Sequence, residues 1–143
     1  MRFGSGDVKF ATIFPADIGR FVARILQDEI RTLNKYVFIY AEEVTQNFVY
    51  ELARRTSSSA GKSIPDLLDV NEEEVKELLR ASDPDGFDFA IWGYVLSIWF
   101  RGDNTMENAK REEYGSALDA RELYPDVKVK KLEEYAKEFY GVV

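Results

Sequence analysis

The chain has 143 residues and a net charge of −7, and it lacks the basic stripe that nucleic-acid binding requires. It contains neither cysteine nor histidine, which excludes disulfides, thiolate nucleophiles, Ser-His-Asp catalysis and the commonest metal ligands within these residues. In an enzyme, proton transfer would therefore fall to Asp, Glu, Lys or Tyr, or to a bound cofactor, and we expect no metal site. The sequence predicts neither a secretory leader nor a membrane span, so we expect a cytoplasmic protein formed as a single domain, 1–143.

The first half of the chain predicts two strands and two helices. Residues 8–14 are partly alternating and β-branched, which favours a strand. Apolar residues in 18–26 recur at helical spacing, although Gly19 is unusual inside a helix and suggests close approach of another backbone. Residues 36–40 are all β-branched or aromatic, which favours a buried strand. Thr45 is placed to cap a helix that runs to about Arg55.

The second half carries clearer start and stop signals. Asn71 and Glu74 form a capping-box pattern before an amphipathic helix. Pro and Gly in the 83–86 turn separate this helix from the next one. The remaining predicted segments are a flexible loop at 57–61, an extended piece at 63–70, a short helix at 118–123, a short strand at 127–129 and a last helix at 132–140.

One stretch, about 87–101, is apolar almost all round and holds both tryptophans. A helix that is apolar on every side is normally buried on every side. The predicted fold is therefore α+β: mostly helical, with a few short strands around this buried central helix. The aromatic side chains of the stretch fit two interpretations, core packing or the walls of a ligand pocket. In the second, Trp92, Tyr94 and Trp99 bind substrate, together with Arg101.

Three carboxylates are the candidate catalytic residues. Asp88 begins the apolar stretch, where burial can raise a carboxyl pKa, although the start of a helix also favours a carboxylate. Asp103 follows Arg101 and equally fits a role in ending the helix. Asp17 equally fits a helix start. Glu42 and Glu43 are weaker candidates, because the pattern around them is also typical of a solvated turn.

Four stretches, in the same order, resemble isoflavone reductases and other NmrA-like proteins, which are atypical short-chain reductases. The tail, Glu122 to Lys128 followed by Leu132 to Tyr135 and Phe139, is the most specific match. The upstream matches are Asp17-Ile18-Gly19 with Arg31 to Lys35, Thr45-Gln46-Asn47, and Arg101 to Asn104.

The resemblance covers only the C-terminal, substrate-side half of such proteins, whose members are about twice as long. It implies that the dinucleotide-binding half and the family's catalytic lysine lie elsewhere, so we expect no cofactor-binding residue here. The one glycine cluster, Gly4-Ser5-Gly6, precedes a strand and lacks the third glycine of a dinucleotide fingerprint. Phe48 replaces an acidic residue that the family usually has, which puts any polar role of that position in doubt.

Two hypotheses follow. The first is an enzyme that acts without nicotinamide, as an isomerase or cyclase, on an apolar aromatic or polyketide-like secondary metabolite. The second is a non-catalytic binding module, or a part that needs a separate NADPH-binding chain to form an oxidoreductase. Because the absent half would leave apolar surface uncovered, we also expect a homodimer.

Overall fold

The computed structural model describes residues 1–141, so the last two residues of the expected 1–143 domain lie outside the described residues. The described chain is mostly helical, with short strands in small sheets, which confirms the α+β class. The helices are α1 (Pro15–Leu26), α2 (Glu29–Thr32), α3 (Gln46–Ser59), α4 (Glu72–Ala81), α5 (Phe87–Leu96), α6 (Met106–Ala109), α7 (Ala120–Leu123) and α8 (Leu132–Tyr140).

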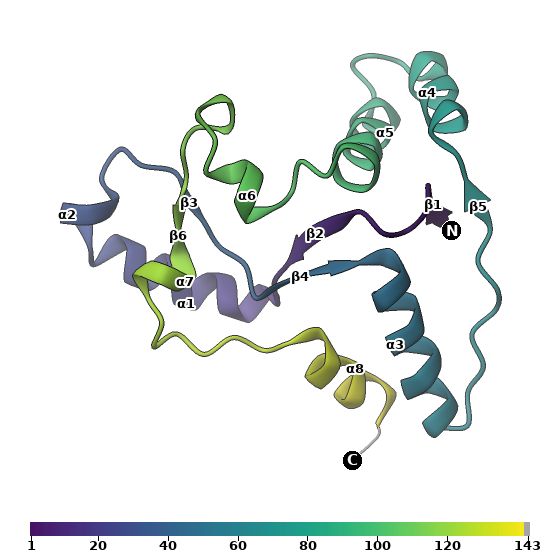
Figure 1. Cartoon of the computed structure of the whole chain (residues 1–143), viewed down its shortest axis with the longest axis horizontal. Helices are drawn as coiled ribbons and strands as arrows, with labels where there is room; N and C mark the ends of the chain where they lie inside the picture. The colour runs from purple at the N-terminus through teal and green to yellow at the C-terminus, as the bar shows by residue number, and fades with distance from the viewer. Residues whose placement is uncertain (142–143) are drawn as a thin grey trace.

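The strands form three separate pairs. The pair β1 (Arg2–Phe3) with β5 (Asp69–Val70) is parallel, as is the pair β3 (Val37–Phe38) with β6 (Leu118–Asp119). The pair β2 (Lys9–Thr12) with β4 (Glu42–Thr45) is antiparallel. These pairs join segments that are far apart in the sequence, and the helices lie around them (Figure 1).

The buried apolar residues form three clusters instead of one. One joins β1 to α4 and α5 through Phe3, Val75 and Leu96. A second is centred on Phe21 and Tyr124, which join α1 to the segment after α7. The third surrounds Met106 in α6. In Figure 1 the first cluster's elements lie at one end of the molecule and those of the second at the other.

The expectation of a buried central helix is wrong in its burial, although the helical span 87–101 is confirmed. Helix α5 continues into a π-helical turn, Ser97–Arg101. It packs against α4 and β1 (Figure 1), and of its residues only Val95 and Leu96 are buried. Phe87 is 79% exposed and Tyr94 65% exposed. The apolar pattern predicted the helix correctly but not what covers it.

Four other local predictions also differ from the structure. The loop expected at 57–61 is mostly helix, because α3 extends to Ser59 and buries Ser57. Its hydroxyls donate back to helix carbonyls, as Ser57 does to Arg54 O at 3.1 Å. The strand expected at 127–129 does not form, and the 36–40 strand shrinks to the half-buried β3. A Cβ added at Gly19 would have no neighbouring atom within 4 Å, so close approach does not explain this glycine.

The helix expected at 118–123 begins only at Ala120, because Leu118 and Asp119 form β6, whereas α3, α4 and α8 begin where the sequence patterns predicted. Thr45 caps α3 by accepting a hydrogen bond from Phe48 N at 3.1 Å. Asn71 and Glu74 form both hydrogen bonds of the capping box that begins α4. Helix α8 begins and ends where the pattern predicted. Local capping signals therefore set these helix starts correctly.

Candidate functional site: an apolar groove between α4, α5 and β1

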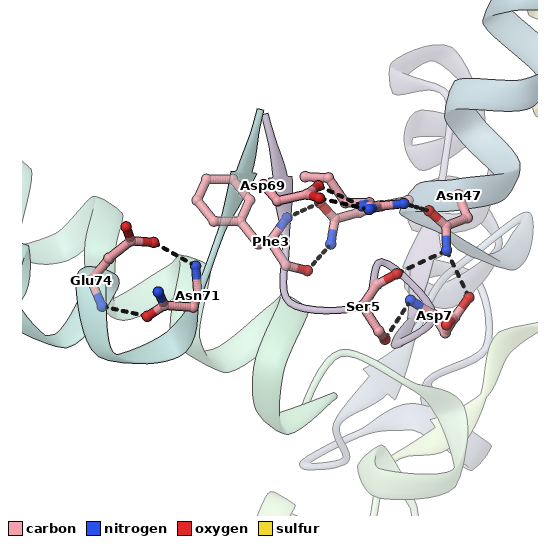
Figure 2. A network of polar contacts seen from close by, with 9 residues as sticks. Phe3, Ser5, Asp7, Asn47, Asp69, Asn71 and Glu74 are labelled. Carbon is pink, nitrogen blue, oxygen red and sulfur yellow. Dashed lines mark hydrogen bonds and ion pairs between the residues drawn. The ribbon is translucent and has the colours of Figure 1, made fainter. Parts of the chain in front are cut away.

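The backbone of β1 is fixed by a side chain at the start of α3. The amide of Gln46 accepts from Phe3 N and donates to Phe3 O, each at 3.0 Å. In the described chain β1 pairs with β5 alone, so this double hydrogen bond takes the place of a second neighbouring strand; Figure 2 draws its two dashed lines at Phe3. The Phe3 backbone is therefore held from α3, while its ring is free to pack elsewhere.

The glycine loop between β1 and β2 is closed by the next residue of α3. Asn47 donates to Ser5 O at 2.9 Å and to Asp7 Oδ1 at 2.7 Å (Figure 2). Gly6 has a φ of +76°, and a Cβ there would lie 2.5 Å from Asn47 Oδ1 and 2.7 Å from Arg2 Cδ. Protein side chains thus already fill the space in front of this loop, and a strand follows it. The loop does not fit a dinucleotide pyrophosphate, which binds at a helix N-terminus.

A wide groove opens on the other side of Phe3, with a volume of about 660 Å³. Strands β1 and β5 form one wall, because their register places Phe3 beside Val70. Helices α4 and α5 contribute the remaining walls. The lining side chains are mainly apolar with an acidic minority: Met1, Phe3, Leu68, Val70, Leu78, Ala81 and Trp92, with Asp69, Glu74 and Glu77.

The two tryptophans occupy different positions relative to this groove. Trp92 lines it directly. Trp99 stacks on Phe3, with ring centroids 4.8 Å apart and planes 8° apart, and its indole nitrogen is buried without a hydrogen-bond partner in the described chain. Trp92 therefore stays a candidate for substrate contact, whereas Trp99 supports the wall from the core. Tyr94 lies in the exposed part of α5, outside the residues that line the groove.

Asp103 lies in a polar cluster just after the π-helical turn. One oxygen accepts from Arg101 Nη2 at 2.6 Å and from Ser97 Oγ at 2.9 Å, and the other accepts from Tyr114 Oη at 2.9 Å. Partial burial acts to raise the pKa of Asp103, but the hydrogen bonds outweigh this effect and hold the pKa below its ordinary value. The same bond raises the pKa of Tyr114. The cluster is thus an ionised carboxylate with a protonated phenol.

The Asp103 cluster borders a smaller cavity of about 260 Å³. Tyr36, Phe38 and Tyr114 supply aromatic walls to this cavity. The structure thus brings together two of the predicted site residues, Asp103 and Arg101, as an ion pair. It does not bring Asp88 or Asp17 to the same cavity.

Asp17 is 1% exposed and holds two parts of the chain together. It accepts from Arg20 Nη1 at 2.7 Å and from Lys130 N at 2.8 Å. Glu42 has a matching role, accepting from Leu132 N at 2.5 Å. These two carboxylates bind backbone N–H groups just before and at the start of α8. Their contacts are those of structural anchors.

The other acidic candidates lie apart from the groove. Asp88 is exposed in the first turn of α5, where a carboxylate is favoured by the helix dipole. Glu43 accepts from Met106 N at 2.6 Å, at the start of α6. The sequence patterns around Glu42 and Glu43 did not predict these backbone partners, because both acceptor–donor pairs join distant segments.

Two further hollows flank α8. One, of about 280 Å³, is lined by Phe14, Leu132 and Tyr135 among others. The other, of about 300 Å³, lies between α3 and α8 and shares Leu132 and Tyr135 with the first. Both are smaller than the α4–α5 groove. Within residues 1–141, no group of three or more acidic side chains is arranged to hold a metal ion, and no helix is long and apolar enough to cross a membrane.

Comparisons with known proteins show which proteins the chain is similar to. No protein-family model matches it. It is 35% identical to an asnovolin J 5',6'-dehydrogenase of Aspergillus novofumigatus, over 85% of this chain and 38% of that protein. It is 31% identical to an isoflavone reductase of Medicago sativa, over 95% of this chain and 40% of that protein.

Solved structures agree with these relatives. The crystal structure of an isoflavone reductase superposes with a TM-score of 0.76 at 30% identity, over 96% of this chain and 42% of that one. Part of a leucoanthocyanidin reductase–NADPH complex from Vitis vinifera has the same fold, with a TM-score of 0.78 at 20% identity, over 99% of this chain and 46% of that one. The fold is thus that of one part of a reductase. The chain matches the C-terminal part of isoflavone reductase-like proteins and spans about two fifths of the length of the relatives it matches.

Proposed function

We propose that this chain binds an apolar aromatic small molecule in the α4–α5 groove and acts as the substrate-side part of a reductase-type enzyme. The observation that carries the proposal is the groove itself. Its volume of about 660 Å³ falls within the range of roughly 300–1,000 Å³ that is typical of small-molecule sites. Its lining includes two aromatic side chains, the buried Phe3 and the partly exposed Trp92, and aromatic side chains suit a planar ligand.

The redox cofactor belongs, in this proposal, to residues outside the chain. The glycine loop is filled by Asn47 and Arg2 and does not fit a pyrophosphate. The matched relatives carry the names of reductases and a dehydrogenase, and each has more than half of its length outside the match. What this chain contributes is a shaped, apolar binding surface that excludes water from a bound ring.

The test is calorimetric titration of the chain with a neutral isoflavone. We expect saturable binding that weakens at least tenfold in Trp92→Leu, which keeps an apolar side chain but removes the flat face. Tyr94→Leu is the matched control, because Tyr94 lies on the same helix outside the groove. Equal affinity in both variants would place the ligand elsewhere. NADPH alone should show no saturable binding, and saturable binding would overturn the assignment of the cofactor to other residues.

The second candidate is the isomerase or cyclase activity without nicotinamide that the sequence suggested, on an aromatic or polyketide-like metabolite. The observation in its favour is the Asp103–Tyr114 pair beside an aromatic cavity. Against it, Asp103 is already bonded to Arg101, and Asp17 and Asp88 have no place in that cavity. The chain alone would have to convert an added substrate into an isomer detectable by chromatography, and Asp103→Asn would have to abolish this conversion.

The expected homodimer remains part of the proposal. Its support is the uncovered face of α5, where Phe87 and Tyr94 are largely exposed. Sedimentation at micromolar concentration should give twice 16.5 kDa, and Phe87→Ser combined with Tyr94→Ser should shift the protein to a monomer. A monomeric wild type would exclude a second copy on this face. A cytoplasmic location likewise stays a prediction from the sequence.

A further inference from the structure

Helix α4 carries four glutamates, and its two basic residues neutralise two of them. Lys76 Nζ lies 2.8 Å from Glu72 Oε1. Arg80 Nη1 lies 2.9 Å from Glu73 Oε1. None of these four residues lines the groove, so both positive charges of α4 are paired outside it.

The acidic residues that line the groove differ in whether they have a hydrogen-bond or ion-pair partner. Glu74 accepts from Asn71 N at 2.7 Å in the capping box, and Asp69 is bound through both oxygens by the Arg2 guanidinium, at 2.8 and 2.9 Å (Figure 2). Glu77 has neither an ion pair nor a hydrogen bond in the part of the chain that the structure describes. The described lining contains three acidic side chains and no lysine or arginine.

We propose that the groove selects flat apolar molecules that carry a protonated amine, with the ammonium group at Glu77 and the ring against Trp92. This inference rests on the proposed function, since it names the ligand class of the same groove. Both residues line the groove, Glu77 from α4 and Trp92 from α5. The ligand therefore spans the two helices, with its charged end toward α4.

The physical basis is charge complementarity at the edge of an apolar surface. An ammonium group at Glu77 gains an ion pair with the carboxylate, while the ring of the ligand packs against Trp92. A neutral alcohol of the same shape keeps the apolar contacts but does not gain the ion pair. A carboxylate meets the charge of Glu77, which is unpaired within residues 1–141, and the Arg2 guanidinium is already bound to Asp69, so the carboxylate is repelled.

Three probes with one ring system test this selection: 1-naphthylmethylamine, 1-naphthylmethanol and 1-naphthoate. Calorimetry at pH 7 and low salt should give the amine about fivefold higher affinity than the alcohol, with the carboxylate weakest. The preference for the amine should shrink at 0.5 M salt, because the pair is exposed to solvent. In Glu77→Gln the amine and the alcohol should bind equally well.

Glu107→Gln is the control, since it removes the same charge from an exposed position on α6 and should keep the amine preference. Equal binding of amine and alcohol to the wild type, both weakened in Trp92→Leu, would overturn the amine selection and leave the groove as the binding site. An amine preference that survives Glu77→Gln would overturn the role of Glu77. Binding of all three probes unaffected by Trp92→Leu would overturn the proposed function as well.

Discussion

The glycine loop and the α4–α5 groove meet at Phe3 and are built in opposite ways. On the loop side, the Phe3 backbone is held by Gln46, and Asn47 closes the loop with two further hydrogen bonds (Figure 2). On the groove side, the Phe3 ring borders a wide apolar space. Polar partners thus lock one face of β1, while the other face is left for packing or a ligand.

This contrast extends to the stretches that carry the family resemblance. Asp17 anchors the segment before α8, Asn47 closes the glycine loop, and Asp103 holds the end of the π-helical turn. Tyr124, from the tail motif, is 1% exposed and donates to Asp28 at 3.0 Å. The hydrogen bonds of these motif residues connect separate segments of the fold. The motifs therefore indicate the fold strongly and the substrate hardly at all.

The largest effect on the free energy of unfolding should come from removing one of these connecting side chains, as in Asp17→Ala. The variant leaves Lys130 N without its acceptor and Arg20 without its carboxylate, so unfolding should become easier by about 3 kcal/mol in urea titrations. Asp126→Ala is the control, because Asp126 pairs with Arg24 at the exposed surface and should cost less than about 0.5 kcal/mol. Similar losses in both variants would contradict the anchoring role of Asp17.

Gly6→Ala tests the closed loop directly. The new methyl group would meet Asn47 Oδ1 and Arg2 Cδ, and the φ of +76° is unfavourable for alanine, so we expect a loss of about 2 kcal/mol in thermal or urea unfolding. Gly19→Ala should do the reverse and stabilise the protein by about 0.5–1 kcal/mol, since its Cβ meets open space inside helix α1. A neutral Gly6→Ala would show that the loop is not held as described.

Asp103→Asn should reveal a pH-dependent contribution of about 1 kcal/mol at pH 7. The folded-state pKa of Asp103 is lowered, so its contribution is complete above the ordinary carboxyl pKa of about 3.9 and is lost as pH falls through the lower folded value. The wild-type and variant stabilities, measured by urea unfolding from pH 7 to pH 2, should therefore begin to approach each other below a pH of about 3.9. A constant difference would mean that the carboxylate charge is not what stabilises the turn.

Helix starts were the part of the fold that the sequence could predict. Thr45 and the Asn71–Glu74 box worked because capping is local. The two-residue strands β1 and β6 were beyond such signals, because each depends on a distant partner strand. The extension of α3 through Ser57 was missed because serine favours loops unless its hydroxyl has a helix carbonyl to bond.

The groove was predictable only in part. Trp92 was a candidate for substrate contact on its aromatic character, and it does line the groove. Phe3, Val70 and Leu78 gave no such signal, because they come from three segments that only the β1–β5 pairing and the α4–α5 contact bring together. The catalytic roles of Asp17 and Asp103 stay predictions, and the contacts that the structure shows for both carboxylates lie within the fold.

The smallest effect on stability should come from the groove itself, as in Leu78→Ala. Leu78 is 43% exposed, so its loss should cost less than about 1 kcal/mol, whereas Val75→Ala on the same helix should cost about 2 kcal/mol because Val75 is fully buried. The order should reverse for binding: Leu78→Ala should weaken the neutral isoflavone severalfold, and Val75→Ala should leave its affinity nearly unchanged as long as the protein is folded. Two opposite rankings on one helix would separate a ligand surface from a core surface, because a merely structural role would rank both measurements alike.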